Sequence, residues 1–218
     1  MQRTDPLIRY YAQRAREFER VYEKPERQGE LQRLQEFVEA TFAGDDVLEV
    51  ACGTGYWTEV LSRFAASVVA TDACEEVLAL ARAKNLGPRV TFRQEDAFSL
   101  PSLSHGFNAS LAAFWWSHIS RAKVREFLAG LHRALAPGAK VVFMDNVYAE
   151  GSSTLVSRTD EQSNSYQTRQ LSDGSIHEVL KNFWTQPELA GTVEGLATDL
   201  RIEFWQYHWI MSYRTLAG

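Results

Sequence analysis

Residues 47–58 read VLEVACGTGYWT and combine a buried strand with a bare turn. The first four residues are typical of a strand in a protein core, although Glu49 places a carboxylate among them. Small residues follow, with glycine at positions 53 and 55. Glycine directly after a strand lets the backbone turn tightly and approach a ligand closely. This segment therefore predicts a ligand-binding turn at the end of a buried strand.

Helix-like and strand-like segments alternate on both sides of this turn. Apolar side chains with helical spacing occur within 31–42, 57–64 and 124–135. The short apolar runs, which are typical of strands buried on both faces, are 47–50, 67–71, 90–93, 108–114 and 140–144. We expect Pro137 and Gly138 to end a helix before the fifth strand. The alternation predicts a doubly wound α/β fold with a mostly parallel sheet flanked by helices.

The chain changes character after residue 146. Residues 147–186 are polar until Phe183, and predict either a long functional loop or small antiparallel strands over the sheet edge. A short helix is expected after Pro187. The aromatic segment 201–216 favours one or two closing strands. Because no repeat or linker divides the chain, residues 1–218 are expected to form one domain.

Composition argues against several classes of partner. The 218 residues carry a formal net charge of -5, which offers no basic surface for nucleic acid. The apolar runs are too short for a membrane helix, and the N-terminus is too charged for a signal peptide, so a cytoplasmic location without membrane contact is predicted. Cys52 and Cys74 lack metal-ligand spacing, so no metal site and no disulfide framework is expected.

A nucleoside ligand without a pyrophosphate is favoured by the residues around the turn. Thr58 stands where the pattern G-x-G-x-x-G requires its third glycine, and no phosphate-binding G-K-[ST] loop follows. Asp72 ends the next strand, where a carboxylate can accept hydrogen bonds from both hydroxyl groups of a ribose. A dinucleotide or ATP is therefore less favoured.

These residues resemble the class I S-adenosylmethionine-dependent methyltransferases of the small-molecule type. The family's first motif is matched at Glu49, Ala51, Gly53 and Gly55, its ribose acid at Asp72 and its adenine-edge acid at Asp96. The resemblance covers residues 31–146 and implies a seven-stranded sheet whose last strand is antiparallel. It also implies an N-terminal helical lid, so that 1–43 comprise lid and first helix and 147–186 a substrate-side excursion. S-adenosylmethionine would be the cofactor and S-adenosylhomocysteine the product.

The resemblance also implies a set of cofactor-binding residues: Tyr11, Arg14, Glu49, Ala51, Gly53, Gly55, Asp72, Ala73, Asp96, Ala97, Phe98 and Phe114. The glycine turn would face the methionine part of the cofactor, with Glu49 organising the turn or meeting the ammonium group through water. Asp72 would hold the ribose, and residues 96–98 would frame the adenine. Phe114 would lie near the transferred methyl group, where an aromatic face attracts a sulfonium cation.

Catalytic residues are less clearly indicated, because methyl transfer needs a base only when the acceptor must lose a proton. His118 is the candidate base, although a structural role is at least equally favoured. Weaker candidates are Asp145, His177, Glu178 and His208. Substrate walls, or alternatively core, are expected from Trp115, Trp116, Tyr148, Phe183 and Trp184.

Four functions stay open from the sequence. Methyl transfer to a nitrogen or oxygen of a small, flat or aromatic metabolite is favoured. A C-methyltransferase acting on a quinone-like ring shares every motif named above. A non-catalytic S-adenosylmethionine-binding module and an NAD-dependent oxidoreductase are the alternatives from other classes. A homodimer is left open.

Overall fold

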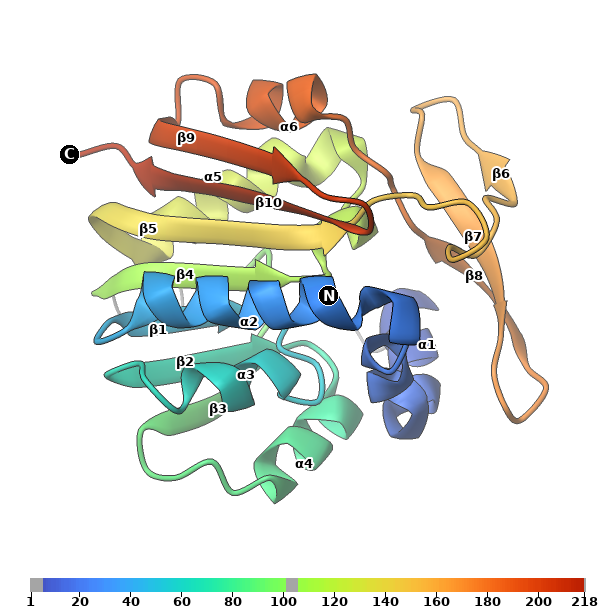
Figure 1. Ribbon diagram of the computed structural model, residues 1–218, viewed down its shortest axis with the longest axis horizontal. Helices are drawn as coiled ribbons and strands as arrows, with labels where there is room; N and C mark the ends of the chain where they lie inside the picture. The colour runs from blue at the N-terminus through green and yellow to red at the C-terminus, as the bar shows by residue number, and fades with distance from the viewer. Residues whose placement is uncertain (1–5, 101–105, 218) are drawn as a thin grey trace.

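The computed structural model describes residues 6–100 and 106–217 (Figure 1). Its centre is a seven-stranded sheet with the strand order β3-β2-β1-β4-β5-β10-β9. The strands are β1 Asp46–Val50, β2 Ser67–Asp72, β3 Val90–Gln94, β4 Phe107–Ala113, β5 Leu135–Asn146, β9 Ala197–Phe204 and β10 His208–Thr215. Strands β1 to β5 are parallel, and β10 is antiparallel to both of its neighbours. The predicted doubly wound fold with an antiparallel last strand is confirmed.

Helices cover both faces of this sheet. They are α1 Pro6–Arg14, α2 Gln28–Phe42, α3 Tyr56–Leu61, α4 Glu75–Ala83, α5 Val124–Ala134 and α6 Gln186–Val193, and short 3-10 turns are η1 Ala15–Tyr22, η2 Pro25–Arg27, η4 Trp116–His118 and η5 Arg121–Lys123. Helices α2 and α3 share one core with the sheet, whereas α5 and α6 share another. In Figure 1, α2 and α3 lie in front of the sheet and α5 behind it.

Side-chain alternation along β1 explains this sandwich. Leu48 and Val50 pack into the core with α5, whereas Val47 packs into the core with α2 and α3. Because successive strand residues point to opposite faces, Glu49 shares the face of Val47. Full burial of one such aliphatic side chain contributes about 1.5–3 kcal/mol. The sheet is therefore held from both sides, which fixes the position of the turn that follows β1.

The expected boundary between the last predicted helix and the fifth strand is wrong. Helix α5 ends at Ala134, and Pro137 and Gly138 lie inside β5 rather than before it. Gly138 has φ +72°, and the pairing of β5 with β4 shifts register in this region. A bulge tolerates both a proline and a left-handed glycine, because neither has to complete the regular ladder of hydrogen bonds.

The polar excursion forms a second, antiparallel sheet, which is the second of the two structures expected for it. Its strands are β6 Arg158–Thr159, β7 Ser165–Gln170 and β8 Ile176–Leu180. This small sheet lies beyond the carboxyl ends of the parallel strands, beside α1 (Figure 1). Leu171 and Val179 pack against Tyr10 of α1, so the N-terminal helix and the small sheet support one another.

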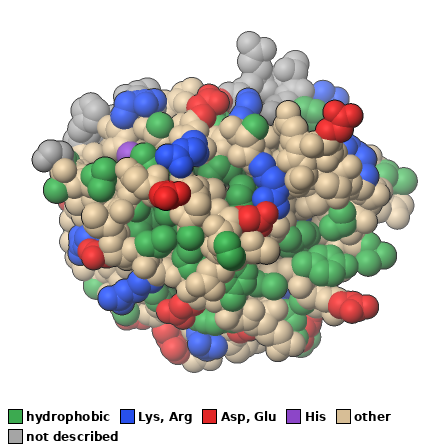
Figure 2. All heavy atoms as spheres, turned by 90° about the horizontal axis from the view of Figure 1, so that it is seen from above, with side chains coloured by type: hydrophobic (Ala, Val, Ile, Leu, Met, Phe, Trp, Pro, Cys, Tyr) green, Lys and Arg blue, Asp and Glu red, His purple; other side chains and the backbone are tan. Residues whose placement is uncertain are grey.

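Mixed surface charge and short helices characterise the described part of the molecule. Figure 2 shows one face on which basic and acidic side chains are interspersed. Among the helices within 6–100 and 106–217, none is long and apolar enough to cross a bilayer.

Candidate active site

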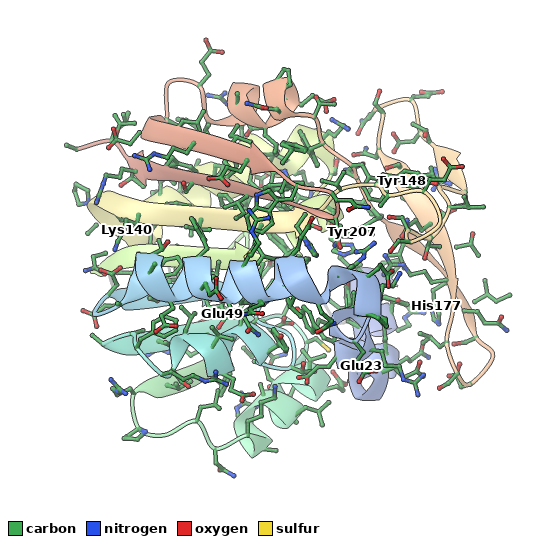
Figure 3. The ribbon with its side chains drawn as sticks, in the orientation of Figure 1. Glu23, Glu49, Lys140, Tyr148, His177 and Tyr207 are labelled. Atoms are coloured by element: carbon green, nitrogen blue, oxygen red, sulfur yellow. The ribbon has the colours of Figure 1, made fainter. Side chains whose placement is uncertain are left out.

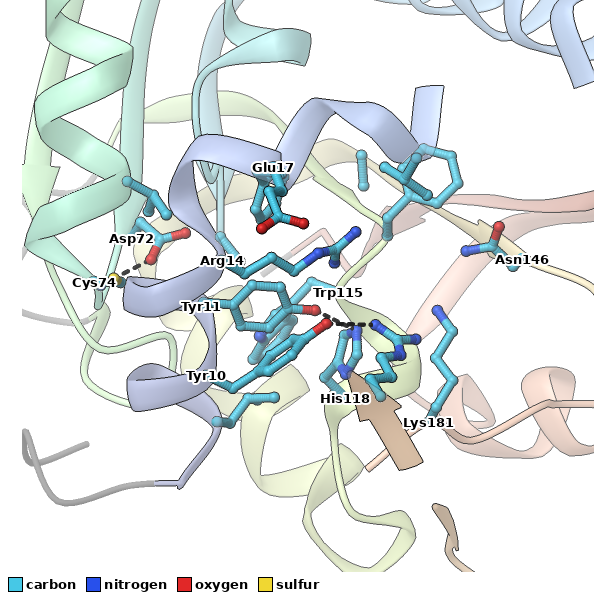
Figure 4. A pocket seen from close by; sticks show the side chains of 18 of the residues that line it. Tyr10, Tyr11, Arg14, Glu17, Asp72, Cys74, Trp115, His118, Asn146 and Lys181 are labelled. Carbon is cyan, nitrogen blue, oxygen red and sulfur yellow. Dashed lines mark hydrogen bonds between the residues drawn. The ribbon is translucent and has the colours of Figure 1, made fainter. Parts of the chain in front are cut away.

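A cavity of about 490 Å³ lies where the parallel strands end, under the N-terminal segment and the small sheet (Figure 4). Its floor includes Ala51 after β1, Asp72 at the end of β2 and Phe114 after β4. Residues of α1 and η1 cover one side, and β7 covers another. Ligands of doubly wound sheets bind at this end of the strands, so the fold places the cavity where a ligand is expected.

The turn after β1 has no side chains at Gly53 and Gly55, because two neighbouring side chains pack closely against its backbone. A Cβ atom on Gly53 would lie 2.6 Å from the Phe18 ring of η1, and one on Gly55 would lie 3.1 Å from Cβ of Ala81 in α4. Gly53, Gly55 and Ala51 all have positive φ, with +56° at Ala51. The glycines therefore let the Phe18 ring and helix α4 pack against this backbone.

Replacing Gly55 tests this packing. Gly55→Ala is expected to lower the free energy of unfolding by about 1–3 kcal/mol, because φ is +79° and the new methyl group is crowded. Gly29→Ala is the matched control, since Gly29 lies in α2 with no atom within 4 Å of the new Cβ. That variant is expected to gain up to about 1 kcal/mol from helix propensity. Equal changes in urea unfolding would contradict the packing argument.

Asp72 ties the turn to the start of α4. Its Oδ2 accepts a hydrogen bond from the Gly53 N–H at 2.9 Å, and its Oδ1 accepts one from the Cys74 N–H at 2.8 Å. Burial raises the pKa of Asp72 to about 6. The carboxylate lines the cavity and keeps unused lone pairs, because each ionised oxygen can accept more than one hydrogen bond.

Glu49 is buried beside the same cavity without a cationic partner in the described part of the chain. The residue is 1% exposed, and the Thr58 hydroxyl donates a hydrogen bond of 2.6 Å to Oε2. Burial raises the pKa of Glu49 to about 8, and the nearby charge of Asp72 adds to this. A cationic ligand group would favour ionisation of Glu49, since an opposite charge lowers a carboxyl pKa.

The adenine-end residues expected from the sequence separate into two groups. Asp96 and Ala97 line the cavity, together with Trp115. Phe98 instead packs against Trp115 and Phe127, with ring centroids 6.2 and 6.1 Å away. Its backbone N–H donates to Oδ1 of Asp96 at 3.0 Å. Phe98 therefore shapes the loop, while Asp96 and Ala97 face the cavity.

Phe114 holds a strained backbone at the end of β4. Its φ is +59°, which is costly for an aromatic residue, and its N–H donates to the Met144 carbonyl at 2.7 Å. The ring packs against Trp57 and Tyr22, with centroids 6.2 and 5.7 Å away. Such strain persists where the surrounding packing fixes it, and it clusters at functional sites.

Comparisons with known proteins agree with this geometry. Residues 47–138 match the model of the family described as "Methyltransferase domain". The demethylmenaquinone methyltransferase of Clavibacter sepedonicus is 34% identical over 107 residues, which are 49% of this chain and 43% of that relative. The structure of a DhpI–SAH complex superposes with a TM-score of 0.79 at 27% identity, covering 98% of this chain and 97% of the other. A DhpI–SAM–HEP complex gives 0.78 at 28%, covering 98% and 100%.

The chain carries a class I S-adenosylmethionine-dependent methyltransferase domain. The chain spans less than half the length of the curated relative named above, whereas it covers almost the whole of the two complexes. S-adenosylmethionine is the cofactor of this family, and the site fits it, because the buried carboxyl group of Glu49 and the carboxylate of Asp72 line one cavity.

The N-terminal helix α1 is joined to the opposite wall of the cavity through Tyr11. The Tyr11 hydroxyl lies 2.8 Å from Nε2 of His118, and Nδ1 of His118 lies 2.6 Å from the Leu180 carbonyl (Figure 4). Because a carbonyl can only accept, Nδ1 carries the proton and Tyr11 donates to Nε2. Burial lowers the pKa of His118 well below its ordinary value, and the charges of Lys181 and Arg169 act in the same direction. His118 is therefore neutral.

A buried ion pair supports this wall of the methyltransferase site. The Lys181 ammonium lies 2.9 Å from Oδ1 of Asp145 and donates to the Ser117 hydroxyl at 2.6 Å. Oδ2 of Asp145 accepts the Ser117 N–H at 2.8 Å. Burial opposes ionisation of Asp145, but the positive charge of Lys181 holds its pKa at about 2. The pair was not found from the sequence, because no motif links two residues so far apart in the chain.

The remaining base candidates lie outside the cavity lining. Glu178 pairs with Arg158, His177 contacts the Ser175 hydroxyl, and Nδ1 of His208 lies 2.8 Å from Oε2 of Glu30. Figure 3 shows His177 in the small sheet and Glu49 within the main sheet. Of the expected aromatic walls, Trp115 and Phe183 line the cavity, Trp116 and Trp184 are core residues, and Tyr148 is exposed.

Proposed function

We propose that this protein transfers the methyl group of S-adenosylmethionine to a nitrogen or oxygen of a small molecule. The observation that carries the proposal is one continuous cavity whose two ends are lined by different kinds of side chain. One end has the carboxyl groups of Glu49 in β1, Asp72 at the end of β2 and Asp96 after β3, and the other end lies under α1 and the small sheet. A cofactor and an acceptor can therefore lie next to each other in one cavity.

The cofactor assignments follow from the positions of the lining residues. Asp72 is proposed to bind the ribose hydroxyl groups, and Glu49 to balance the ammonium group of the methionine part. Asp96 and Ala97 are proposed to border the adenine. Ala73, next to Asp72, and the Phe114 ring line the same space, which supports contacts to the ribose side and to the methyl-bearing sulfur.

The reaction needs alignment more than covalent help from the protein. An electron pair of the acceptor forms the new bond to the methyl carbon, and the electrons of the broken carbon–sulfur bond return to sulfur, which becomes a neutral thioether. Holding the three atoms in line contributes up to about 7–11 kcal/mol. The covering residues Tyr11 and Arg14 of α1 are proposed to close the cavity once both ligands are bound.

His118 as a base stays a prediction. Its Nε2 is already occupied by the Tyr11 hydroxyl, and its pKa is low because of burial and two nearby cations. These features make it a weak base, whereas they suit a residue that orients Tyr11 toward the cavity. An acceptor that arrives ionised needs no proton acceptor.

C-methylation of a quinone-like ring is the second candidate. The name of the Clavibacter sepedonicus relative supports it, since that protein is a demethylmenaquinone methyltransferase. The acceptor end of the cavity speaks against it, because charged side chains line that end. The cytoplasmic location, the absence of nucleic-acid partners and the homodimer stay predictions.

The test combines binding and transfer. Purified protein is titrated calorimetrically with S-adenosylhomocysteine and then incubated with methyl-labelled S-adenosylmethionine and a fractionated metabolite extract. We expect heat of binding and a labelled small molecule detected by mass spectrometry. Binding without any labelled product would favour a non-catalytic cofactor-binding module, and no binding would remove the proposal.

A further inference from the structure

The acceptor end of the cavity gathers basic side chains from separate parts of the chain. They are Arg14 at the end of α1, Lys24 and Arg27 at η2, Arg169 in β7 and Lys181 after β8. The whole chain has a net charge of -5, so this local excess opposes the overall sign. Charges that line a cleft with apolar walls attract a counter-ion more strongly than charges spread over a surface.

Arg27 is the most buried of the three arginines, at 6% exposed. Its Nη1 donates to Oδ1 of Asn146 at 2.8 Å, and its Nη2 and Nε donate to the Ser152 hydroxyl at 2.9 and 3.1 Å. Both partners are neutral, and within the described residues no carboxylate forms an ion pair with Arg27, although the charges of Glu26 and Glu30 act on it from nearby. A buried guanidinium with neutral partners is costly unless a ligand brings the opposite charge.

Arg14 and Arg169 face the same space and likewise lack ion pairs within the parts of the chain that the structure describes. The Arg14 guanidinium lies over the Tyr10 and Phe18 rings, at 5.8 and 5.7 Å from their centroids. The Nη2 of Arg169 donates to Oε1 of Gln167 at 2.8 Å, and Gln167 is itself anchored on the Thr154 carbonyl. Neighbouring rings and amides therefore orient both guanidinium groups. In Figure 4, Arg14 lies between Asp72 and Asn146.

The acids around this end offset only part of its positive charge. Glu26 accepts a hydrogen bond from the Ser152 hydroxyl and acts on Lys24 and Arg27, but no ion pair joins it to either within the described residues. Asp145 balances Lys181, and the Lys24 ammonium contacts the Ser152 carbonyl. Glu17 is the acid that lines the cavity near this end, and its carboxylate bonds to Ser172 and lies 3.5 Å from Arg20. The excess charge therefore belongs to Lys24 and to the three guanidinium groups of Arg14, Arg27 and Arg169.

We infer that the methyl acceptor carries an oxyanion group, phosphoryl or carboxylate, which Arg14, Arg27 and Arg169 bind inside the cavity. The inference rests on the proposed function, because S-adenosylmethionine must occupy the other end. Guanidinium groups match the geometry of two oxygens of such an anion at once. An uncharged quinone ring would leave these charges without a partner.

The experiment uses protein saturated with S-adenosylhomocysteine, so that the cofactor end is filled before the acceptor end is probed. Inorganic phosphate and acetate are titrated in separate arms, each against an uncharged analogue, trimethyl phosphate or acetamide. Binding is followed by calorimetry and by the rise in melting temperature that a ligand of the folded state produces. Arg169→Gln is the test variant. Arg158→Gln is its matched control, because Arg158 lies in the same small sheet, exposed and paired with Glu178.

We expect one or both anions to bind and the uncharged analogues not to bind. Arg169→Gln should weaken anion binding by about tenfold or more, with S-adenosylhomocysteine affinity unchanged, whereas Arg158→Gln should change neither. Phosphate binding alone would assign a phosphoryl acceptor, and acetate binding alone a carboxylate. Cofactor binding without binding of either anion, or equal anion affinity in both variants, would overturn the inference. Failure to bind S-adenosylhomocysteine would instead count against the proposed function.

Discussion

Asp145→Ala is expected to lower the free energy of unfolding by about 3–5 kcal/mol, the cost of removing one partner from a buried ion pair. Lys181 would then stay buried without its counter-charge, and the Ser117 N–H would lose its acceptor. For a chain of this size, the loss corresponds to a fall in melting temperature of roughly 6–20 °C. Thermal unfolding followed by circular dichroism measures the change.

Two controls make this result specific. Arg158→Gln breaks an exposed pair with Glu178 and should change stability by less than about 1 kcal/mol. The double variant Asp145→Leu, Lys181→Met removes both charges, and should recover much of the loss, because well-packed apolar residues replace a buried pair at little cost. A single variant as stable as the double variant would show that the pair contributes nothing at this position.

The same pair predicts how stability depends on pH. The pKa of Asp145 is about 2 in the folded protein, because the charge of Lys181 overcomes the effect of burial, and it is about 3.9 for an unfolded aspartate. Its contribution is therefore fully present above about pH 4 and is lost as the pH falls toward 2. Asp145→Ala should flatten that part of the stability curve. An unchanged acid limb in the variant would argue against the ionised pair.

The second large effect is expected on cofactor affinity. Asp72→Ala should raise the dissociation constant of S-adenosylhomocysteine by roughly ten- to a hundredfold, about 1.5–3 kcal/mol, the range for hydrogen bonds to a charged group. The reason is geometric, because the carboxylate ends β2 at the cavity while Gly53 and Cys74 hold it in place. Calorimetric titration measures the constant directly.

Asp46→Ala is the control for this prediction. Asp46 begins β1 at the opposite end of the sheet and contacts Ser67, so it shares the residue type and the sheet without facing the cavity. Its loss should leave cofactor affinity unchanged. Because Asp72 also accepts two backbone N–H groups, melting temperatures of both variants are measured alongside. Weakened binding equal in the two variants would remove Asp72 from the ribose role.

Much of the fold and of the cofactor end could be predicted from the sequence, because the relevant signals are local. Buried strands recur with helix-period segments between them, and the turn after β1 carries its glycines within nine residues of Glu49. Ala51 and Asp72 line the cavity where the motif spacing predicted. The predicted helix end at Pro137 and Gly138 was wrong. These residues lie at a bulge inside β5, and a bulge depends on the partner strand, which the local sequence does not reveal.

Only the tertiary structure decided the character of the cavity end that lies under α1 and the small sheet. Arg14, Arg27, Arg169 and Lys181 come from four segments with no common motif, and they converge because the small sheet and the N-terminal helix pack over the strand ends. Residue type by itself did not distinguish Trp115, which lines the cavity, from Trp116, which is buried in the core. The sequence by itself predicted a nucleoside site at the turn after β1, since the glycines and the acid that ends the next strand are local signals. The basic character of the opposite end depends on which distant side chains meet, and only long-range packing brings those side chains together.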